Sequence, residues 1–398
     1  MGAGSGAEAL AAEALRWMIG AAPADDPTLY SGGAGVVMAL LEAQRHFGDD
    51  YYGDEAVRRA AALDLTGDDS SLYFGLTGTA VALRAVHERL GDEAVGRAAD
   101  QALRLVRERF DGERWGEMFE LLFGNAGIAL GALHAGDLEL AVVAVDPYRR
   151  TADPTPGGVN WAVRPSPPRS HHIAHGTLGI VHALAAVGAA AGRPDLIELA
   201  RAGAADVVSR NEAGPDGFLV PHSDPPHRPE LIERYSFGWC NGPAGDAQVF
   251  RRLGRLTGEA AWPALADRCW HTVTTSGLPA RLRPGFWDNS GRCCGTAGVL
   301  ALACDRHVER SEPLDFATVL VDDLTRRATV DAAGARWSNH EHRATPSALA
   351  PEPGWAMGNA GIIRELLRFA RLTAGADPEY AVAWPDHPPL SAIGHTNQ

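Results

Sequence analysis

The stretch AHGTLGIVHALAAVG, residues 174–188, decides the fold of this chain, because it joins a Gly-x-x-Gly pair to an apolar run. After the second glycine, apolar residues recur at the three-and-four spacing of an α-helix. The pattern occurs seven times, with glycine pairs at 32/35, 75/78, 124/127, 176/179, 242/245, 295/298 and 358/361. Such self-similarity is typical of a repeat architecture, so each pair predicts a helix that begins beside it.

Further helices are predicted between the glycine pairs, over residues 7–18, 93–109, 195–209, 262–275 and 314–328. The repeating unit is therefore a helical hairpin, and no alternating β-branched runs indicate strands. A paired glycine lets the backbone approach its neighbours closely, and we expect free amide N–H groups there to point into the mouth of the structure. The periodicity leaves open whether the hairpins form an open solenoid or a closed ring.

The domain organisation follows from the repeats. We expect one domain over residues 1–398, with long loops near residues 146–170, 211–235 and 337–354 and an irregular tail at 377–398. The first loop is rich in proline and glycine, and the third contains His340 and His342. Loops of this length in a compact fold are usually functional or mobile.

Composition excludes several classes of protein. The 36 basic and 50 acidic residues give a formal net charge of -14, which disfavours nucleic-acid binding. No segment approaches the roughly 18 apolar residues of a membrane span, and the N-terminus lacks the features of a signal peptide. We therefore expect a cytoplasmic protein. The odd, sparse set of five cysteines argues against a secreted disulfide framework and favours reduced thiols or metal ligands.

Reactive side chains precede the glycine pairs of three consecutive repeats. His175 precedes the fourth pair, Cys240 the fifth, and Cys293 and Cys294 the sixth. If the repeats are equivalent, these side chains lie at the same end, and ring closure or strong curvature would bring them together. Three thiols favour a tetrahedral zinc site with one vacant position, which distinguishes a catalytic from a structural zinc. The two cysteines outside this pattern, Cys269 and Cys304, are predicted to lie in the core.

The motifs on these successive repeats, His175-Gly176, Trp239-Cys240-Asn241-Gly242 and Cys293-Cys294-Gly295, together resemble the lanthionine synthetase C family. The resemblance covers nearly the whole chain. It implies an all-α fold, an α/α toroid with a double-layered barrel of seven inner and seven outer helices and one Zn²⁺ at one end. It also implies a set of site residues, with zinc ligands Cys240, Cys293 and Cys294, the catalytic acid His175 and its acidic partner Glu120.

The resemblance further implies a reaction. Cysteine thiols of a dehydrated precursor peptide would add to dehydroalanine or dehydrobutyrine and form thioether rings. Zinc lowers the pKa of a bound thiol, His175 would protonate the α-carbon, and Glu120 would orient His175 or help to remove the thiol proton. A separate dehydratase or kinase/lyase enzyme would supply the dehydrated peptide, and neither nucleic acid nor a membrane span is expected.

Three departures from the family pattern affect the details. Cys294 replaces a histidine ligand, and a third thiolate would make the bound sulfur more nucleophilic, which predicts a faster but less discriminating cyclase. Asn241 follows Cys240 where the family often has an aromatic residue or histidine. Ser236 stands where an arginine is found, and Arg234 is a candidate to replace that arginine.

Other interpretations stay open at this point. The chain could add glutathione to dehydrated residues, serve as a non-catalytic scaffold of a peptide-modifying complex, or be another helical toroid such as a glycosidase or a prenyltransferase subunit. His175 could cap a helix, and Glu120 could stabilise a helix N-terminus. The upstream residues His171 and His172 are predicted to lie at the surface or in a substrate channel.

Overall fold

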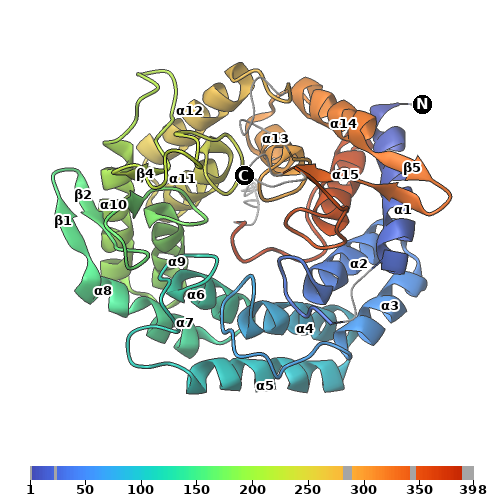
Figure 1. Cartoon of the computed structure of the whole chain (residues 1–398), viewed down its shortest axis with the longest axis horizontal. Helices are drawn as coiled ribbons and strands as arrows, with labels where there is room; N and C mark the ends of the chain where they lie inside the picture. Colours follow the sequence, from blue (N-terminus) through green and yellow to red (C-terminus); the bar gives the residue numbers. More distant parts are fainter. Residues whose placement is uncertain (1, 22–24, 281–288, 341–346, 388–398) are drawn as a thin grey trace, which may run out of the picture.

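The computed structural model describes residues 2–21, 25–280, 289–340 and 347–387. Within these ranges, fourteen helices of eight or more residues form two concentric layers (Figure 1). The inner layer contains α2 (Gly33–Phe47), α4 (Leu76–Leu90), α6 (Asn125–His134), α9 (Thr177–Ala190), α11 (Pro243–Thr257), α13 (Thr296–Arg310) and α15 (Asn359–Thr373). The outer layer contains α1 (Ala3–Ala21), α3 (Asp50–Ala60), α5 (Glu93–Glu108), α7 (Leu138–Val145), α10 (Pro194–Val208), α12 (Ala261–Thr275) and α14 (Asp315–Arg327). The expected α/α toroid is therefore confirmed.

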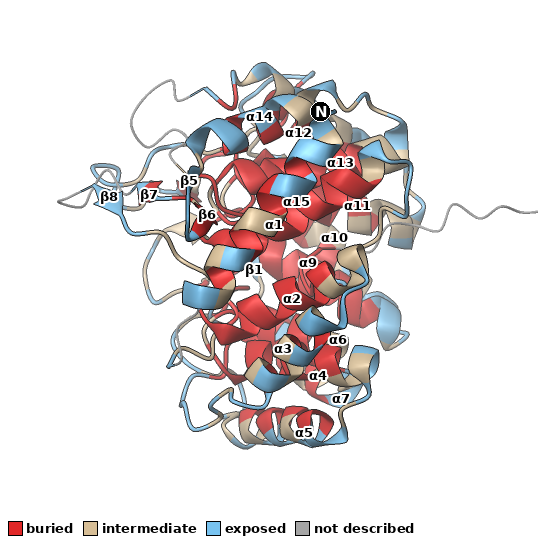
Figure 2. Cartoon of the chain, turned by 90° about the vertical axis from the view of Figure 1, so that its right-hand side faces the viewer, coloured by how far each residue is buried: buried red, intermediate tan, exposed pale blue. Residues whose placement is uncertain are grey.

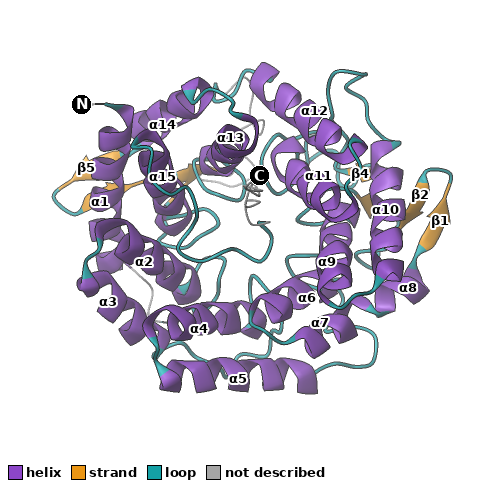
Figure 3. Ribbon diagram, turned by 180° about the vertical axis from the view of Figure 1, so that it is seen from behind, coloured by secondary structure: helices purple, strands orange, loops and turns teal. Residues whose placement is uncertain are grey.

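The ring closes between the two ends of the chain. Each inner helix packs against the inner helices before and after it, and the last of them, α15, packs against the first, α2. The N-terminal helix α1 packs against α15 and is thus the outer partner of the last inner helix (Figure 3). The question that the periodicity left open is settled in favour of a closed ring.

Burial explains why the two layers differ in sequence. All residues of α2 from Gly33 to Ala43 are buried, because an inner helix is covered on most of its circumference. The outer helix α5 is amphipathic and buries one stripe that includes Val95, Ala99 and Val106. Figure 2 shows the result, with buried inner helices and outer helices that expose one face.

The outer layer also contains two helices that the sequence did not predict, α3 and α7. Both are short. Helix α3 buries only Gly53, Ala56 and Ala60, so its apolar stripe is too narrow to stand out. Helix α7 is apolar on nearly every side and shows no clear periodicity.

The segments predicted as long loops contain short elements. The first holds α8 (Pro147–Thr151), β1 (Asp153–Thr155), β2 (Gly158–Asn160) and β3 (Arg169–Ser170), the second holds β4 (Ser223–Asp224), and the third holds β7 (Asn339–His340) and β8 (Ala348–Leu349). With β5 (Thr329–Asp331) and β6 (Gly334–Arg336), these strands form antiparallel two-stranded pairs, β1 with β2, β3 with β4, β5 with β6 and β7 with β8. His342 lies outside the described residues. No helix in the described part of the chain is long and apolar enough to cross a membrane.

The glycine pairs are required by close packing of the segment that precedes each inner helix. A Cβ on Gly78 would lie 1.9 Å from the carbonyl oxygen of Leu72, and a Cβ on Gly245 would lie 1.9 Å from that of Trp239. Glycine is the residue that tolerates such an approach. The expectation of free amide N–H groups at the glycine pairs was wrong. The N–H of Leu178, for example, donates to the carbonyl of His171 at 2.9 Å, so the preceding loop satisfies it.

The C-terminal segment after α15 runs into the centre of the ring (Figure 1). As far as residue 387 it contains no helix or strand, and residues 388–398 of the predicted tail lie outside the described residues. The N–H of Ala381 donates to the Glu42 carboxylate at 2.7 Å, and His387 lies 3.0 Å from the Asp305 carboxylate. Glu42 and Asp305 belong to inner helices in different parts of the ring, so this segment joins them.

Candidate metal centre and active site

One backbone position is shared by all repeats at the mouth of the ring. The residue two positions before the first glycine is, in order, Tyr30, Tyr73, Leu122, Ala174, Cys240, Cys293 and Ala356. Six hydrogen bonds of 2.8–3.4 Å link these residues between neighbouring repeats, including Cys240 N–H to the Cys293 carbonyl and Ala356 N–H to the Tyr30 carbonyl. The repeats are therefore equivalent here, and the residues that precede their glycines lie at the same end of the toroid.

The link between Leu122 and Ala174 differs from the other six. The N–H of Leu122 donates to the carboxylate of Glu120 in its own loop. Glu120 is fully buried, and its Oε1 lies 3.5 Å from Nδ1 of His175. The side chain of His175 is 30% exposed, so the carboxylate lies behind an imidazole that faces solvent. A carboxylate in this position can orient an imidazole that acts as an acid or a base.

The three cysteines of the fifth and sixth repeats form one cluster. The Sγ atom of Cys294 lies 3.1 Å from Sγ of Cys240 and 3.5 Å from Sγ of Cys293, and all three sulfurs lie within 4.8 Å of one another. None of the three forms a disulfide. Thiolates bound to Zn²⁺ at about 2.3 Å in a tetrahedron are roughly 3.8 Å apart. The cluster therefore has the size and the ligand type that zinc prefers.

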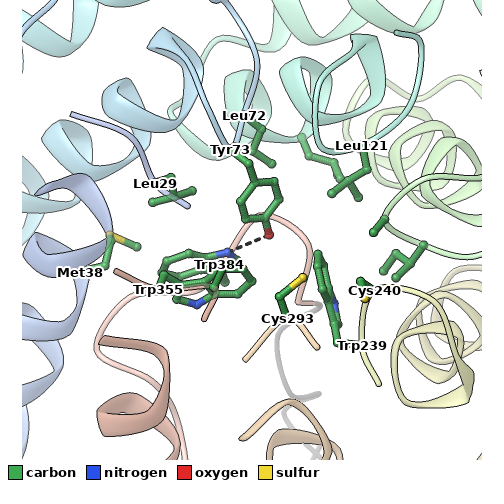
Figure 4. Packing of buried hydrophobic residues seen from close by; sticks show 14 of the residues in the cluster. Leu29, Met38, Leu72, Tyr73, Leu121, Trp239, Cys240, Cys293, Trp355 and Trp384 are labelled. Carbon is green, nitrogen blue, oxygen red and sulfur yellow. Dashed lines mark hydrogen bonds between the residues drawn. The ribbon is translucent and has the colours of Figure 1, made fainter. Parts of the chain in front are cut away.

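The surroundings of the cluster also fit a cation. Hydrogen bonds with Cys240 and Cys294, followed by burial, raise the pKa of the Cys293 thiol well above its usual value. Three adjacent thiolates, two of them on buried residues, would repel one another, and a divalent cation removes that penalty. In Figure 4, Cys293 lies between the rings of Trp239 and Trp355. The side chain of Asn241 donates to Sγ of Cys240 at 3.5 Å.

The cluster and His175 open into one cavity of about 670 Å³. His175, Cys240, Asn241 and Cys294 line this cavity, and so does His340 of the third loop. Three apolar side chains that are more than a third exposed also belong to the lining, namely Phe123, Leu231 and Leu349. The cavity can therefore offer a peptide both reactive groups and apolar contacts.

The cavity-lining residues that the sequence analysis did not identify include Arg164 and His222. Both lie in long loops and not beside a glycine pair, so no motif marks them. Arg234, the expected replacement for the missing arginine, instead forms an ion pair with Glu212, is 53% exposed and does not line this cavity. Arg164 does line it, and its buried Nε has no hydrogen-bond partner among the described residues.

The positions of two histidines differ from the prediction. His171 and His172 are not at the surface, since they are 0% and 1% exposed. Pairing of β3 with β4 covers them, and Nδ1 of His172 lies 2.8 Å from Oδ2 of Asp246. By contrast, Cys269 and Cys304 are completely buried, as predicted.

Comparison with solved structures supports the fold. A structure of nisin cyclase is 15% identical to this chain with a TM-score of 0.63, and the match covers 92% of each chain. The unsaturated glucuronyl hydrolase from Bacillus sp. GL1 is 16% identical with a TM-score of 0.50, over 87% of this chain and 97% of that one. At such identities the likeness concerns the fold alone. No curated protein sequence matches this chain significantly.

The sequence itself identifies the family. It matches the family described as Lanthionine synthetase C-like protein over residues 23–228 and 227–321, well over half of the chain. These ranges include Glu120, His175 and the three clustered cysteines. This chain therefore belongs to the lanthionine synthetase C-like family.

Proposed function

We propose that this protein is a zinc-dependent lanthipeptide cyclase, which adds cysteine thiols of a dehydrated precursor peptide to dehydroalanine or dehydrobutyrine. The observation that carries the proposal is the cluster of three sulfurs within 4.8 Å of one another, which shares a cavity with His175. Family membership supports a cyclase-type function. One Zn²⁺ held by Cys240, Cys293 and Cys294 would leave a fourth position for the substrate sulfur.

The bound metal would supply Lewis acidity, which favours the thiolate form of a substrate cysteine at neutral pH. The chain's own residues then have distinct tasks. When the thiolate attacks the β-carbon, negative charge develops on the neighbouring carbonyl oxygen. Arg164 is the guanidinium that lines the cavity, and its unpartnered Nε suits it to stabilise that charge. His175 delivers a proton to the α-carbon, and the buried Glu120 orients its imidazole.

The substrate is proposed to be a peptide that a separate dehydratase or kinase/lyase enzyme has dehydrated. The apolar residues Phe123, Leu231 and Leu349 in the cavity lining support a peptide with apolar side chains near its cysteine. A cavity of about 670 Å³ accommodates only a few residues, so the rest of the precursor would lie outside it.

The test combines metal analysis with a synthetic peptide that carries one cysteine and one dehydroalanine. We expect one zinc per purified chain, and we expect the peptide to lose its free thiol with no change in mass. A mass increase only when glutathione is added would instead indicate a glutathione-adding enzyme. A zinc-free protein that leaves the peptide unchanged would contradict the proposal and favour a scaffold.

A further inference from the structure

The proposed zinc site carries one negative charge more than the family's usual set of ligands. Two thiolates and an imidazole neutralise Zn²⁺, whereas the thiolates of Cys240, Cys293 and Cys294 make the metal unit an anion. Arg292, next to Cys293 in the chain, is already paired with the carboxylate of Glu365 at 3.2 Å. A largely buried anion of this kind is stabilised when neutral groups donate hydrogen bonds to its sulfurs.

Tyr30 brings such a group to the cluster from the first repeat. It occupies the first of the seven equivalent positions at the mouth and lines the cavity together with Cys240 and Cys294. Its side chain makes a hydrogen bond with the side chain of Cys293. A phenol has one proton to donate and a thiolate can only accept, so the hydroxyl of Tyr30 is the donor once the sulfur is ionised.

The backbone and the ring of Tyr30 are both held in place. The carbonyl of Tyr30 accepts from the N–H of Ala356 at 2.9 Å, and the carbonyl of Ala356 accepts from the N–H of Cys293 at 2.8 Å. The ring stacks on Phe74 with centroids 4.6 Å apart and meets Tyr73 edge-on at 6.3 Å. The hydroxyl is therefore oriented by the fold, which lowers the entropic cost of its hydrogen bond to sulfur.

Asn241 supplies a second donor from the fifth repeat. This residue follows Cys240, at a position where the chain departs from the family pattern, and it lines the cavity. Its Nδ2 atom donates to Sγ of Cys240 at 3.5 Å. Two of the three sulfurs therefore each have a neutral donor, and the two donors come from different parts of the ring.

We propose that Tyr30, together with Asn241, is a positioning residue that offsets the charge of the third thiolate by donating a hydrogen bond to a ligand sulfur. The inference rests on the proposed zinc-dependent function and adds to it a determinant of metal affinity. A hydrogen bond draws electron density from a thiolate and stabilises it in a site that excludes water. Without the donor the buried anion costs more free energy, and its sulfur becomes richer in electrons.

Metal affinity and an optical spectrum test this assignment apart from turnover. Zinc affinity is measured by competition with a chromophoric chelator, and Co²⁺ in place of zinc gives a thiolate-to-cobalt charge-transfer band. For Tyr30→Phe we expect the zinc affinity to fall about 10- to 100-fold and the band to move to longer wavelength. Asn241→Ala should change both in the same direction. Tyr73→Phe is the matched control and should equal the wild type, because its hydroxyl donates to Asp386 at 2.7 Å.

A second background tests the role of charge. Cys294→His makes the metal unit neutral, so Tyr30→Phe should weaken zinc binding less in that background than in the wild type. An equal loss in both backgrounds would mean that Tyr30 acts through packing, which overturns the inference. If the wild type binds one zinc and Tyr30→Phe matches its affinity and its band, the assignment of Tyr30 is wrong and the zinc site stands. A wild type that binds neither zinc nor Co²⁺ would contradict the cyclase proposal and this inference with it.

Discussion

The second and sixth repeats place different side chains on the same backbone frame. Tyr73 and Cys293 occupy equivalent positions in the ring of hydrogen bonds, and Phe74 and Cys294 follow them. In the second repeat, Phe74 stacks on Tyr30 and on Phe123 with ring centroids 4.6 and 4.5 Å away. In the sixth, Cys294 joins a cluster of sulfurs. The frame thus depends on glycines and backbone, whereas the chemistry depends on the two residues before each glycine pair.

The largest expected effect comes from removing a sulfur. For Cys240→Ser we expect the zinc content to fall from about one ion per chain to near zero, and cyclisation to be lost with it, because two thiolates no longer form the site. Elemental analysis and the peptide assay measure both. The buried Cys269 lies outside the cluster, so Cys269→Ser is the control and should keep its zinc. Equal zinc content in both variants would show that the cluster does not bind the metal.

Loss of the His175 imidazole should leave the metal in place. For His175→Ala we expect kcat to fall roughly 100- to 10,000-fold with unchanged zinc content, the range for a lost general acid. Glu120→Gln should have a smaller effect because it acts through His175. The double variant then tests the coupling. If the effects of the two changes multiply in full, Glu120 does not work through His175.

The shared frame can be tested at its glycines in both halves of the ring. Gly78→Ala and Gly245→Ala each place a Cβ against a carbonyl oxygen, so each should lower the free energy of unfolding by about 1–3 kcal/mol. Gly67→Ala meets no atom within 4 Å and should change it by less than about 0.5 kcal/mol. Denaturant unfolding provides the comparison. Similar values for all three would show that close approach does not select these glycines.

A smaller effect is expected when the third thiol becomes the family's usual ligand. Cys294→His should keep zinc and remove one negative charge from the metal unit, which makes the bound sulfur less nucleophilic. We expect cyclisation to slow by up to about tenfold, about 1.4 kcal/mol in the barrier, with a narrower set of ring products. Mass spectrometry with thiol alkylation follows both. An unchanged rate and ring pattern would refute the role given to the extra thiolate.

The smallest change is expected in the second repeat, where Phe74 lies in a stack of aromatic rings. Phe74→Leu replaces one apolar ring in the stack, so the free energy of unfolding should fall by less than about 1.5 kcal/mol and zinc content should not change. Thermal unfolding and elemental analysis check this. A loss of zinc in this variant would mean that the thiol cluster depends on the aromatic stack around Phe74.

The sequence predicted those parts of the molecule that repeat. The inner helices follow glycine pairs, and the proximity of Cys240 to Cys293 and Cys294 follows from equivalent positions in neighbouring repeats. The unpredicted parts depend on single, long-range pairings. His172 was placed wrongly because its burial requires β3 to pair with β4, about fifty residues later in the chain. Arg164 was missed because it lies in a loop whose path no local pattern determines.

The seam between α15 and the first two helices constrains how this protein is made. The site at the sixth repeat hydrogen-bonds through Cys293 to Ala356 in the seventh, and Ala356 in turn donates to Tyr30 in the first. These contacts join the beginning of the chain to its end, and such non-local contacts form late because the intervening chain must first be closed into a loop. A ribosome therefore has to release the chain as far as the seventh repeat before the thiol cluster is held in its final geometry.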